Sequence, residues 1–428
     1  MEETIIEIDV EQEVIEENKA CKTSERFKLI RNGILISGLS VFAQLYLFQP
    51  MLGLISKDLK VAPATSSLAV SASTTGMAVG LFILAFKADA IERKKLMSLS
   101  LFISSVITLL SAFSWNFTTL VFLNFLKGIV LSGVSAVALA YLTEEVSVVI
   151  MGLAISLYLS GNTLGGMSGR IIAILTSGYY GWRSATFAIG ILSLLMAVGF
   201  SKIFPKSVNF KPGNIHIAQK LTQMKGFMKN TLFIGMFIVG GIVMGVFVSI
   251  YNYLNFILEA PPFSLPHYII ALIFLMYTVG IGGSIFSGKW SDRINPSIVL
   301  KGLLLSMLLG LFMLQSTQLW IVVFGLGVVT FSFFGTHTMA SRIVSEYANE
   351  GKSSATCLYW LFYYIGSSVV GYVTGIFLFS FGWNIFMDII MIMTLIAFFI
   401  AIISTRHLVN IHFRFERIQL LLNRRNLK

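Results

Sequence analysis

Long apolar segments separated by short polar turns make up most of this chain of 428 residues. A helix that crosses the hydrocarbon core of a bilayer needs about 20 apolar residues, because backbone groups cannot be left unpaired in lipid. The strict alternation that marks transmembrane β-barrels is absent from the sequence. The pattern therefore predicts an all-α protein with twelve membrane-spanning helices, near residues 33–56, 68–87, 96–114, 118–142, 148–177, 183–204, 231–257, 267–288, 297–316, 318–342, 354–380 and 383–404.

Polar segments divide these helices into two groups of six. Residues 205–230 contain two prolines and five lysines, which predicts a cytoplasmic linker with room for a short surface helix. The first 31 residues hold nine of the twenty carboxylates, so a disordered acidic arm is expected there. The predicted organisation is an acidic tail (1–31), a first bundle (32–204), the linker (205–230), a second bundle (231–404) and a basic tail (405–428).

Composition supports a membrane protein and limits its partners. A hydrophobic content of 56% and a mean hydropathy of +0.83 exclude a soluble globular chain. The net charge of +11 would suit nucleic acid, but the basic residues lie in the tails, the linker and alternate turns. The opposite side holds only Lys57, Lys60 and Arg183. Because cytoplasmic loops collect basic residues, both termini are expected in the cytoplasm, with the bilayer and not nucleic acid as partner.

Several other functional classes are excluded by what the sequence lacks. Residues 1–31 are polar and acidic and show no recognisable secretory signal peptide, so the first helix is expected to direct membrane insertion. No phosphate-binding loop and no soluble segment large enough for an ATPase domain are present. The five histidines and two cysteines show no metal-ligand spacing, and no nucleophile elbow occurs. We therefore expect no cofactor, no metal and no ATP-driven step.

The second half of the chain repeats features of the first. Asp89 and Asp292 lie 203 positions apart, each in a charged turn between apolar segments. Six helices repeated on six is typical of secondary transporters, whose binding cavity lies at the midplane between the halves. Four further matches share an offset of 201, namely Glu145 with Glu346, Leu157-Tyr158 with Leu358-Tyr359, Gly165 with Gly366, and Gly181-Trp182 with Gly382-Trp383.

The charged turns carry a resemblance to a known family. In the major facilitator superfamily, helices two and three are joined by Gly-x-x-x-Asp-Arg-x-Gly-Arg-Arg, and this chain keeps Asp89, Arg93 and Lys94 at the matching positions. Ala90 and Glu92 replace the family's Arg and Gly in this turn, and the second copy keeps Gly288, Asp292 and Arg293. The chain resembles the superfamily over its whole membrane region, and within it the bacterial drug and sugar efflux permeases of the YnfM type.

The resemblance implies a major facilitator fold with two pseudo-symmetric bundles, a monomer, and a place in the bacterial inner membrane. It also implies that the charged turns are conformational latches, with Asp89, Arg93, Asp292 and Arg293 as candidate gating residues. Each aspartate can cap a helix end and pair with basic groups across the cytoplasmic face. The alternative is that these turns serve only topology and tight chain reversal.

The fourth predicted helix contains Lys127, which lies about one helical turn from the position where the family has an arginine. The segment Asn124-Phe-Leu-Lys-Gly resembles the family's Arg-x-x-Gln-Gly, with Asn124 at the Arg position and Lys127 at the Gln position. A lysine within a membrane segment costs on the order of 3 kcal/mol to insert, so we expect it to face a wet cavity or a partner. Lys127 is a candidate for binding an anionic group or for proton coupling; the alternative is an ammonium that reaches the outer surface.

The fifth predicted helix is rich in glycine. Gly161, Gly165 and Gly169 recur at spacings of four, which places small residues on one face and allows close helix packing. Gly165 and the following Arg170 are candidate gating residues, since the segment resembles the glycine-rich helix five of the family's antiporters. An interfacial anchor is the alternative for Arg170, and pure packing is the alternative for the glycines.

Polar and aromatic side chains in other helices could line a substrate cavity. Rings offer stacking surfaces, and amides and hydroxyls offer hydrogen bonds. Helix packing and an interfacial aromatic belt are the alternatives for each. The candidates are Gln44, Gln49, Asn124, Lys127, Tyr251, Asn252, Asn255, Tyr277, His337, Tyr359 and Tyr363.

The candidates for ion coupling are Lys127, His337 and Asp388. Asp388 is the one carboxylate within a predicted span, although the last helix is usually peripheral. An imidazole has an ordinary pKa of about 6.5, which suits proton exchange. Protons as coupling ion are implied by the resemblance and not by these residues.

These features predict a secondary transporter that moves a small organic solute by alternating access, with proton-coupled efflux of a drug or sugar-like substrate as the leading expectation. Uptake or uniport of a metabolite by the same fold is the alternative. A membrane-embedded enzyme would need paired carboxylates or a histidine cluster at one membrane face, and neither is visible. A signalling protein would be expected to add a folded domain. We therefore expect a transporter and not an enzyme.

Overall fold

The computed structural model describes residues 19–210, 212, 217–348 and 351–425, without the side chains of Asp89, Val148 and 407–425. These residues form helices joined by short turns, plus one isolated β-bridge between Ala20 and Val146. Eleven of the helices are long and apolar enough to cross a membrane. One of them, α8 (Met151–Ile203), is two helices that meet at Gly181. The prediction of an all-α membrane protein with twelve spans is therefore confirmed.

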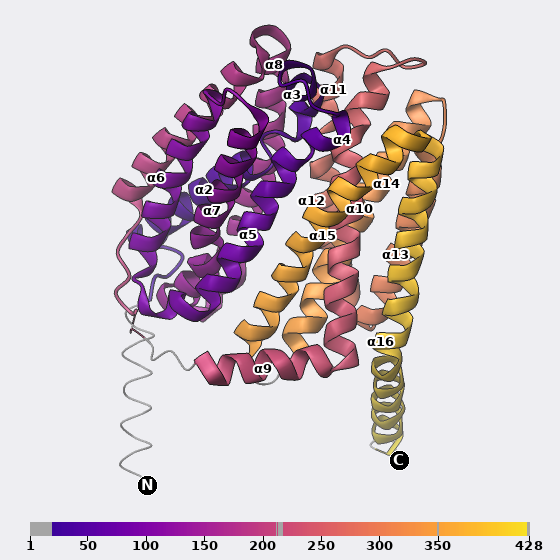
Figure 1. Cartoon of the computed structure of the whole chain (residues 1–428). Helices are drawn as coiled ribbons and strands as arrows, with labels where there is room; N and C mark the ends of the chain where they lie inside the picture. Colours follow the sequence, from indigo (N-terminus) through magenta and orange to yellow (C-terminus); the bar gives the residue numbers. More distant parts are fainter. Residues whose placement is uncertain (1–18, 211, 213–216, 349–350, 426–428) are drawn as a thin grey trace. The chain divides into compact units, whose positions relative to one another are not determined.

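Unit 1 comprises Met1–Lys60 and Ala72–Ile217. Its helices, in indigo to magenta in Figure 1, run side by side along most of their length. They are α2 (Glu25–Leu45), η1 (Gln49–Met51), α3 (Leu52–Asp58), most of α5 (Leu68–Lys87), η2 (Ala88–Ala90), α6 (Arg93–Ala112), α7 (Phe117–Glu145), η3 (Val148–Ile150) and α8.

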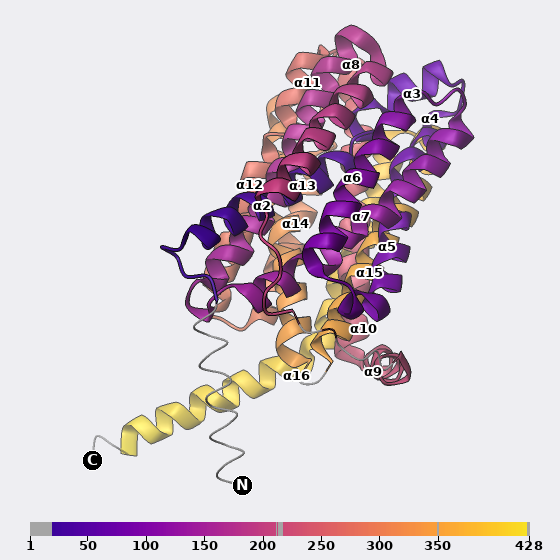
Figure 2. The same ribbon diagram turned by 90° about the vertical axis from the view of Figure 1, so that its left-hand side faces the viewer.

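Unit 2 comprises Val61–Ser71 and Ala218–Lys428. In Figure 1, α9 runs crosswise to α10, and Figure 2 shows the last turns of α16 projecting beyond the neighbouring helices of this unit. Its elements are α4 (Pro63–Ser66), α9 (Ile217–Lys229), α10 (Thr231–Glu259), α11 (His267–Ile273), α12 (Met276–Ser291), α13 (Pro296–Met313), α14 (Leu319–Tyr347), α15 (Lys352–Phe381) and α16 (Trp383–Arg425).

The first helix begins earlier than the hydrophobic pattern indicates. The side chain of Ser24 accepts a hydrogen bond from the backbone N–H of Phe27, and α2 starts at Glu25. An N-cap of this kind satisfies one of the unpaired N–H groups of the first turn, so it can start a helix in polar sequence. Residues 25–31 are therefore helical and not part of a disordered arm, whereas residues 1–18 lie outside the described part of the chain.

The first span is broken near its far end. α2 stops at Leu45, and Pro50 occupies an early position of the short helix η1, after which α3 continues to Asp58. Proline lacks the N–H that a continuous helix would need and clashes with the preceding turn. The break changes the direction in which the side chains of residues 46–49 point.

The internal repeat is visible in equivalent turns and helix contacts. Gly181 and Gly382 both have left-handed backbone angles, with φ of 80° and 85°, and each precedes a tryptophan. Gly165 packs against the backbone of Leu39 in unit 1, and Gly366 packs against the backbone of Gly241 in unit 2. A side chain at either glycine would meet main-chain atoms, so both units use a glycine to bring two helices together.

Candidate functional site

Lys127 lies at the centre of the most unusual polar cluster in unit 1. Its side chain is fully buried in α7, and its Nζ has no hydrogen-bond partner among the described residues. The ammonium group lies 5.0 Å from the centroid of the Phe48 ring, a distance at which a cation is attracted to the ring face. Lys127 therefore does not extend to an exposed surface, and an aromatic face is its nearest electrostatic support.

The break in the first span supplies the residues around this cation. Tyr46 and Phe48 are buried between the end of α2 and the start of η1, and Gln49 opens η1. Phe48 faces Lys127, while Tyr46 and Gln49 face Arg170 of α8. A continuous helix would spread four consecutive residues around its circumference. The interruption lets Tyr46, Phe48 and Gln49 converge on two buried cations.

Arg170 is held by three contacts. Its Nε donates to Gln49 Oε1 at 2.6 Å, and its Nη1 donates to the backbone oxygen of Gly166 at 2.5 Å. The guanidinium carbon lies 4.7 Å from the centroid of the Tyr46 ring. Only 3% of Arg170 is exposed, so it is a buried cation and not an interfacial anchor. Gly165 lies one helical turn away on the face that packs against Leu39.

Gln44 and Asn124 are buried in the same unit and are hydrogen-bonded. Gln44 accepts a hydrogen bond from Thr108 Oγ1 at 2.8 Å and donates to the backbone oxygen of Ser40 at 3.1 Å. Asn124 donates to the backbone oxygen of Leu120 at 2.8 Å and lies 3.3 Å from Ser73 Oγ. These amides tie α2 to α6 and α7 to α5, while Lys127, one turn beyond Asn124, has no such bond within the described part of the chain.

The candidates of unit 2 gather in an aromatic cluster around His337. His337 Nδ1 lies 2.8 Å from the hydroxyl of Tyr359, and which atom donates depends on the imidazole tautomer. The ring of Tyr363 lies 4.7 Å from the His337 ring, and that of Trp360 lies 5.3 Å from it. The structure thus brings His337 of α14 together with Tyr359 and Tyr363 of α15, which the sequence places in separate predicted helices.

Tyr251 and Tyr277 form the other end of this cluster. Tyr251 shares a hydrogen bond of 2.9 Å with Thr330, and the rings of Tyr251 and Tyr277 are 5.2 Å apart. Phe247 stacks on Phe333 at 3.8 Å and contacts both tyrosines, which links the group to α14. Asn252 and Asn255 are also buried in α10.

An ion pair ties each charged turn to a neighbouring helix. Arg93 donates from Nη2 to Glu144 Oε1 at 2.8 Å and from Nη1 to the backbone oxygen of Ala88 at 2.6 Å. Asp292 is bound at 2.8 Å by Arg342 from α14, while Arg293 is exposed. The Asp89 side chain lies outside the described residues. The helix end at Glu92 is capped by Glu92 itself, which accepts from the N–H groups of Lys94 and Lys95.

Asp388 lies apart from both clusters. Its side chain is on the exposed face of α16 and accepts a hydrogen bond of 2.9 Å from Gln315. Asp388 therefore belongs to neither the Lys127 cluster nor the His337 cluster. The structure leaves Asp388 as a coupling candidate only at the periphery of unit 2.

Sequence reasoning missed Phe48, Glu144 and Arg342. Phe48 is one aromatic residue among many, and nothing in its spacing distinguishes it until the break at Pro50 is known. Glu144 and Arg342 stand at the ends of α7 and α14, 51 and 50 positions beyond the charges that they bind. Because the separation is nearly the same in the two halves, a comparison of the repeats could have predicted that Glu144 and Arg342 pair with these turns.

Comparisons with known proteins agree with this fold. Residues 34–371 match the Major Facilitator Superfamily. An uncharacterized transporter of Buchnera aphidicola subsp. Schizaphis graminum is 35% identical over 381 residues, 89% of this chain and 92% of the relative. The inner membrane transport protein YnfM of Escherichia coli K12 is 32% identical over 376 residues, 88% of this chain and 90% of the relative.

A solved structure of similar fold is that of a bacterial homologue of the human lysosomal transporter Spinster, in an inward-facing and occupied conformation. The TM-score is 0.72 at 13% sequence identity, over 90% of this chain and 98% of that one. The expected kinship with YnfM is confirmed by the sequence comparison. The chain therefore belongs to the Major Facilitator Superfamily, as a multi-pass membrane protein and a secondary transporter of a small solute rather than an enzyme.

Proposed function

We propose that this transporter works by alternating access and carries a small organic anion whose negative group pairs with Lys127. The observation that carries the proposal is the fully buried Nζ with no hydrogen-bond partner among the described residues. A buried charge without a partner costs several kcal/mol. The cation–π contact with Phe48 offsets about 2 kcal/mol of this cost. A group that arrives with the solute would supply the remaining stabilisation.

The surroundings of Lys127 support a solute with apolar as well as anionic parts. Phe48 presents a ring beside the ammonium group, and Tyr46 presents one beside Arg170. The guanidinium of Arg170 is already engaged by Gln49 and Gly166, which makes it a support for the broken segment. The Lys127 ammonium group, which has no hydrogen-bond partner among the described residues, is then the cation that can bind the negative group of the solute. The aromatic cluster around His337 offers stacking surfaces within unit 2.

Lys127 also bears on the direction of transport. An anion binds Lys127 only when the lysine is protonated, so the carrier holds the proton and the solute at the same time. Such coupling favours movement of both in one direction, which under an inward proton gradient is uptake. The second candidate is export of a drug or sugar-like molecule in exchange for protons, supported by the resemblance to efflux permeases. In that mechanism His337 and Asp388 would be the further proton-exchanging groups.

Transport by the purified full-length chain in proteoliposomes tests this proposal. The probes are benzoate and gluconate, with benzamide and glucose as neutral counterparts, under imposed pH gradients of either sign. We expect benzoate or gluconate to move with the protons, and Lys127→Gln to lower that rate roughly tenfold or more at normal abundance. Lys202→Gln, which alters an exposed lysine of the same unit, should leave the rate unchanged.

Two results would contradict the proposal. Unaltered anion transport by Lys127→Gln would remove the lysine from the solute site. Transport of the neutral probes alone, driven against the proton gradient, would favour export in exchange for protons. Lys127→Arg separates charge from shape, because it keeps a cation but changes its size and geometry.

A further inference from the structure

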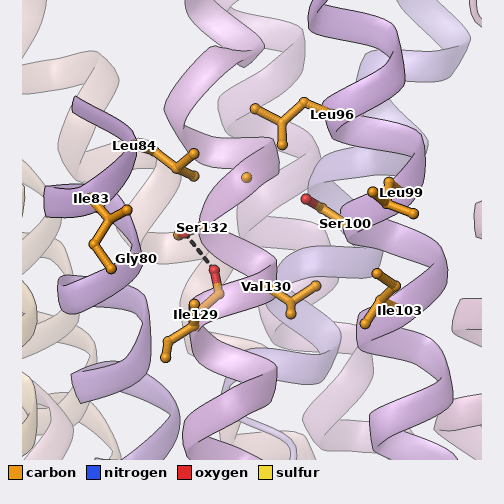
Figure 3. A pocket seen from close by; sticks show the side chains of 11 residues that line it. Gly80, Ile83, Leu84, Leu96, Leu99, Ser100, Ile103, Ile129, Val130 and Ser132 are labelled. Atoms are coloured by element: carbon orange, nitrogen blue, oxygen red, sulfur yellow. Dashed lines mark hydrogen bonds between the residues drawn. The ribbon is translucent and has the colours of Figure 1, made fainter. Parts of the chain in front are cut away.

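An apolar groove runs over α7 between α5 and α6, entirely within unit 1. Its volume is about 240 Å³, and Figure 3 shows its lining side chains pointing toward one another across the gap. An engineered cavity of about 150 Å³ is large enough to hold benzene, so this groove can hold a run of several methylene groups. It is lined by Gly80, Ile83 and Leu84 of α5, Leu96, Leu99, Ser100 and Ile103 of α6, and Ile129, Val130, Ser132 and Gly133 of α7.

Small residues form the floor of the groove. A Cβ at Gly80 would lie 2.7 Å from the backbone oxygen of Ile129, and one at Gly133 would lie 3.1 Å from the Cβ of Ser100. These contacts bring α5 and α6 close to α7 at its base, while the larger aliphatic side chains stand as walls. The Ser132 hydroxyl donates to Ile129 O at 2.6 Å, so its proton is already used. The Ser132 hydroxyl at the floor therefore needs no water molecule to accept its proton.

The walls of the groove are open to the outside of unit 1. Ile83, Leu99 and Ile103 are 44%, 53% and 36% exposed. All three lie in helices that are apolar enough to span the membrane, so their exposed surfaces contact hydrocarbon and not water. An empty groove would forfeit dispersion contacts along its lining. Acyl chains are the hydrocarbon available there.

One end of the groove carries exposed cations. Lys87 follows Ile83 by four residues in α5, and Lys95 precedes Leu99 by four residues in α6, a spacing that places each lysine on the groove face of its helix. Both lysines are exposed. Arg93 is not available to a further anion, because Glu144 already pairs with it. Glu92 is also engaged, as the cap of α6.

We propose that unit 1 binds one anionic phospholipid at this place, with an acyl chain in the groove and the phosphate between Lys87 and Lys95. Each basic side chain near a membrane surface contributes about 1 kcal/mol toward an anionic lipid. The groove adds shape to this attraction, since it seats a chain next to the two lysines. The groove lining includes neither Lys127 nor Phe48, so this site is distinct from the one proposed for the solute.

Native mass spectrometry of the full-length protein tests the proposal, with phosphatidylglycerol and phosphatidylethanolamine as the added lipids. We expect wild type to retain one phosphatidylglycerol at roughly tenfold lower lipid concentration than phosphatidylethanolamine. Val130→Trp places a ring in the middle of the groove and should remove this preference. Phe122→Trp, on an exposed position of the same helix outside the groove, is the matched control and should retain it.

The charge is tested separately from the groove. Lys87→Gln combined with Lys95→Gln should reduce phosphatidylglycerol retention to the level of phosphatidylethanolamine, whereas Lys202→Gln should not. If Val130→Trp fails to fold, Ile103→Trp at the open wall replaces it. Equal retention of both lipids by wild type, or undiminished retention in the groove variants, overturns the proposal. So does loss of transport in Val130→Trp with the lipid still bound, which would assign the groove to the solute.

Discussion

The interiors of the two units are built on one repeated frame but contain different chemistry. Unit 1 buries Lys127 and Arg170 beside single rings from the broken first span. Unit 2 buries an aromatic cluster around His337, and the position 201 residues after Arg170 is Gly371. Duplication has preserved helices and turns, because those determine the fold, while interior side chains have been free to diverge. Unit 1 thus buries charged side chains, and unit 2 buries a cluster of aromatic ones.

The polar turns show the same divergence in a simpler form. In unit 1 the cation Arg93 begins α6 and its partner Glu144 lies near the end of α7. In unit 2 the acid Asp292 follows α12 and its partner Arg342 lies near the end of α14. The signs of the charges are reversed, yet both pairs join neighbouring spans at their polar ends. What the repeat retains is therefore a connection between helices and not a particular residue.

The largest effect is expected where the two units are alike. Gly165→Leu and Gly366→Leu should each lower the amount of folded protein in the membrane severely, because each new side chain meets the backbone of the neighbouring helix. Overpacking of this kind costs about 3 kcal/mol or more. Gly199→Leu is the control, since nothing lies within 4 Å of a Cβ there. Quantitative immunoblotting of membranes measures the effect, and tolerance of either change would contradict equivalent packing.

The next two substitutions should change the stability of the protein in opposite directions, upward for one in unit 1 and downward for one in unit 2. Lys127→Met removes a buried ammonium that has no hydrogen-bond partner among the described residues, so we expect it to raise stability by about 2 kcal/mol. The same variant should lose anion transport. A rise in the thermal unfolding temperature of the purified protein, together with loss of anion transport in proteoliposomes, would show both consequences of removing this charge. A fall would mean that Lys127 has a stabilising partner in the resting protein.

His337→Leu should destabilise unit 2. The change removes the imidazole partner at 2.8 Å from the buried Tyr359 hydroxyl and leaves it the longer contact of 3.4 Å with the backbone oxygen of residue 337, at a cost of about 1 to 2 kcal/mol. Adding Tyr359→Phe removes this poorly paired hydroxyl and should restore part of the loss. Thermal unfolding of the two single variants and the double variant gives the coupling between them. Additive losses would show that the hydrogen bond contributes nothing.

Sequence reasoning predicted the elements of this fold well because membrane helices carry a strong hydrophobic signal. The twelve spans and the linker helix follow from apolar length and polar interruptions, and the glycine at each Gly-Trp turn follows from the repeat. The start of α2 at Glu25 was missed, because a single serine cap and not hydrophobicity determines it.

The candidate site was predictable only in part. Lys127 stands out in any apolar segment, since burying a lysine is costly. Its neighbour Phe48 does not, because the contact depends on how the chain turns after α2. Glu144 was missed for a related reason: an acidic residue at a helix end is common, and only the three-dimensional fold brings it to Arg93. The sequence identifies residues that are costly to bury in a membrane, such as Lys127, whereas their partners are known only once the helices are packed together.

The smallest effect is expected at the Gly-Trp turns, where the two units use the same residue for different bonds. The indole N–H of Trp182 donates to Asp58 at 3.0 Å, and that of Trp383 donates to the backbone oxygen of Leu314 at 3.0 Å. Trp182→Phe and Trp383→Phe should each cost about 1 kcal/mol, measured by thermal unfolding. Asp58 keeps its ion pair with Arg183 when Trp182 is replaced, whereas the carbonyl of Leu314 loses the donor. Trp383→Phe should therefore be the more damaging of the two, and the reverse order would show that the indole bond, and not the ion pair, holds the turn in unit 1.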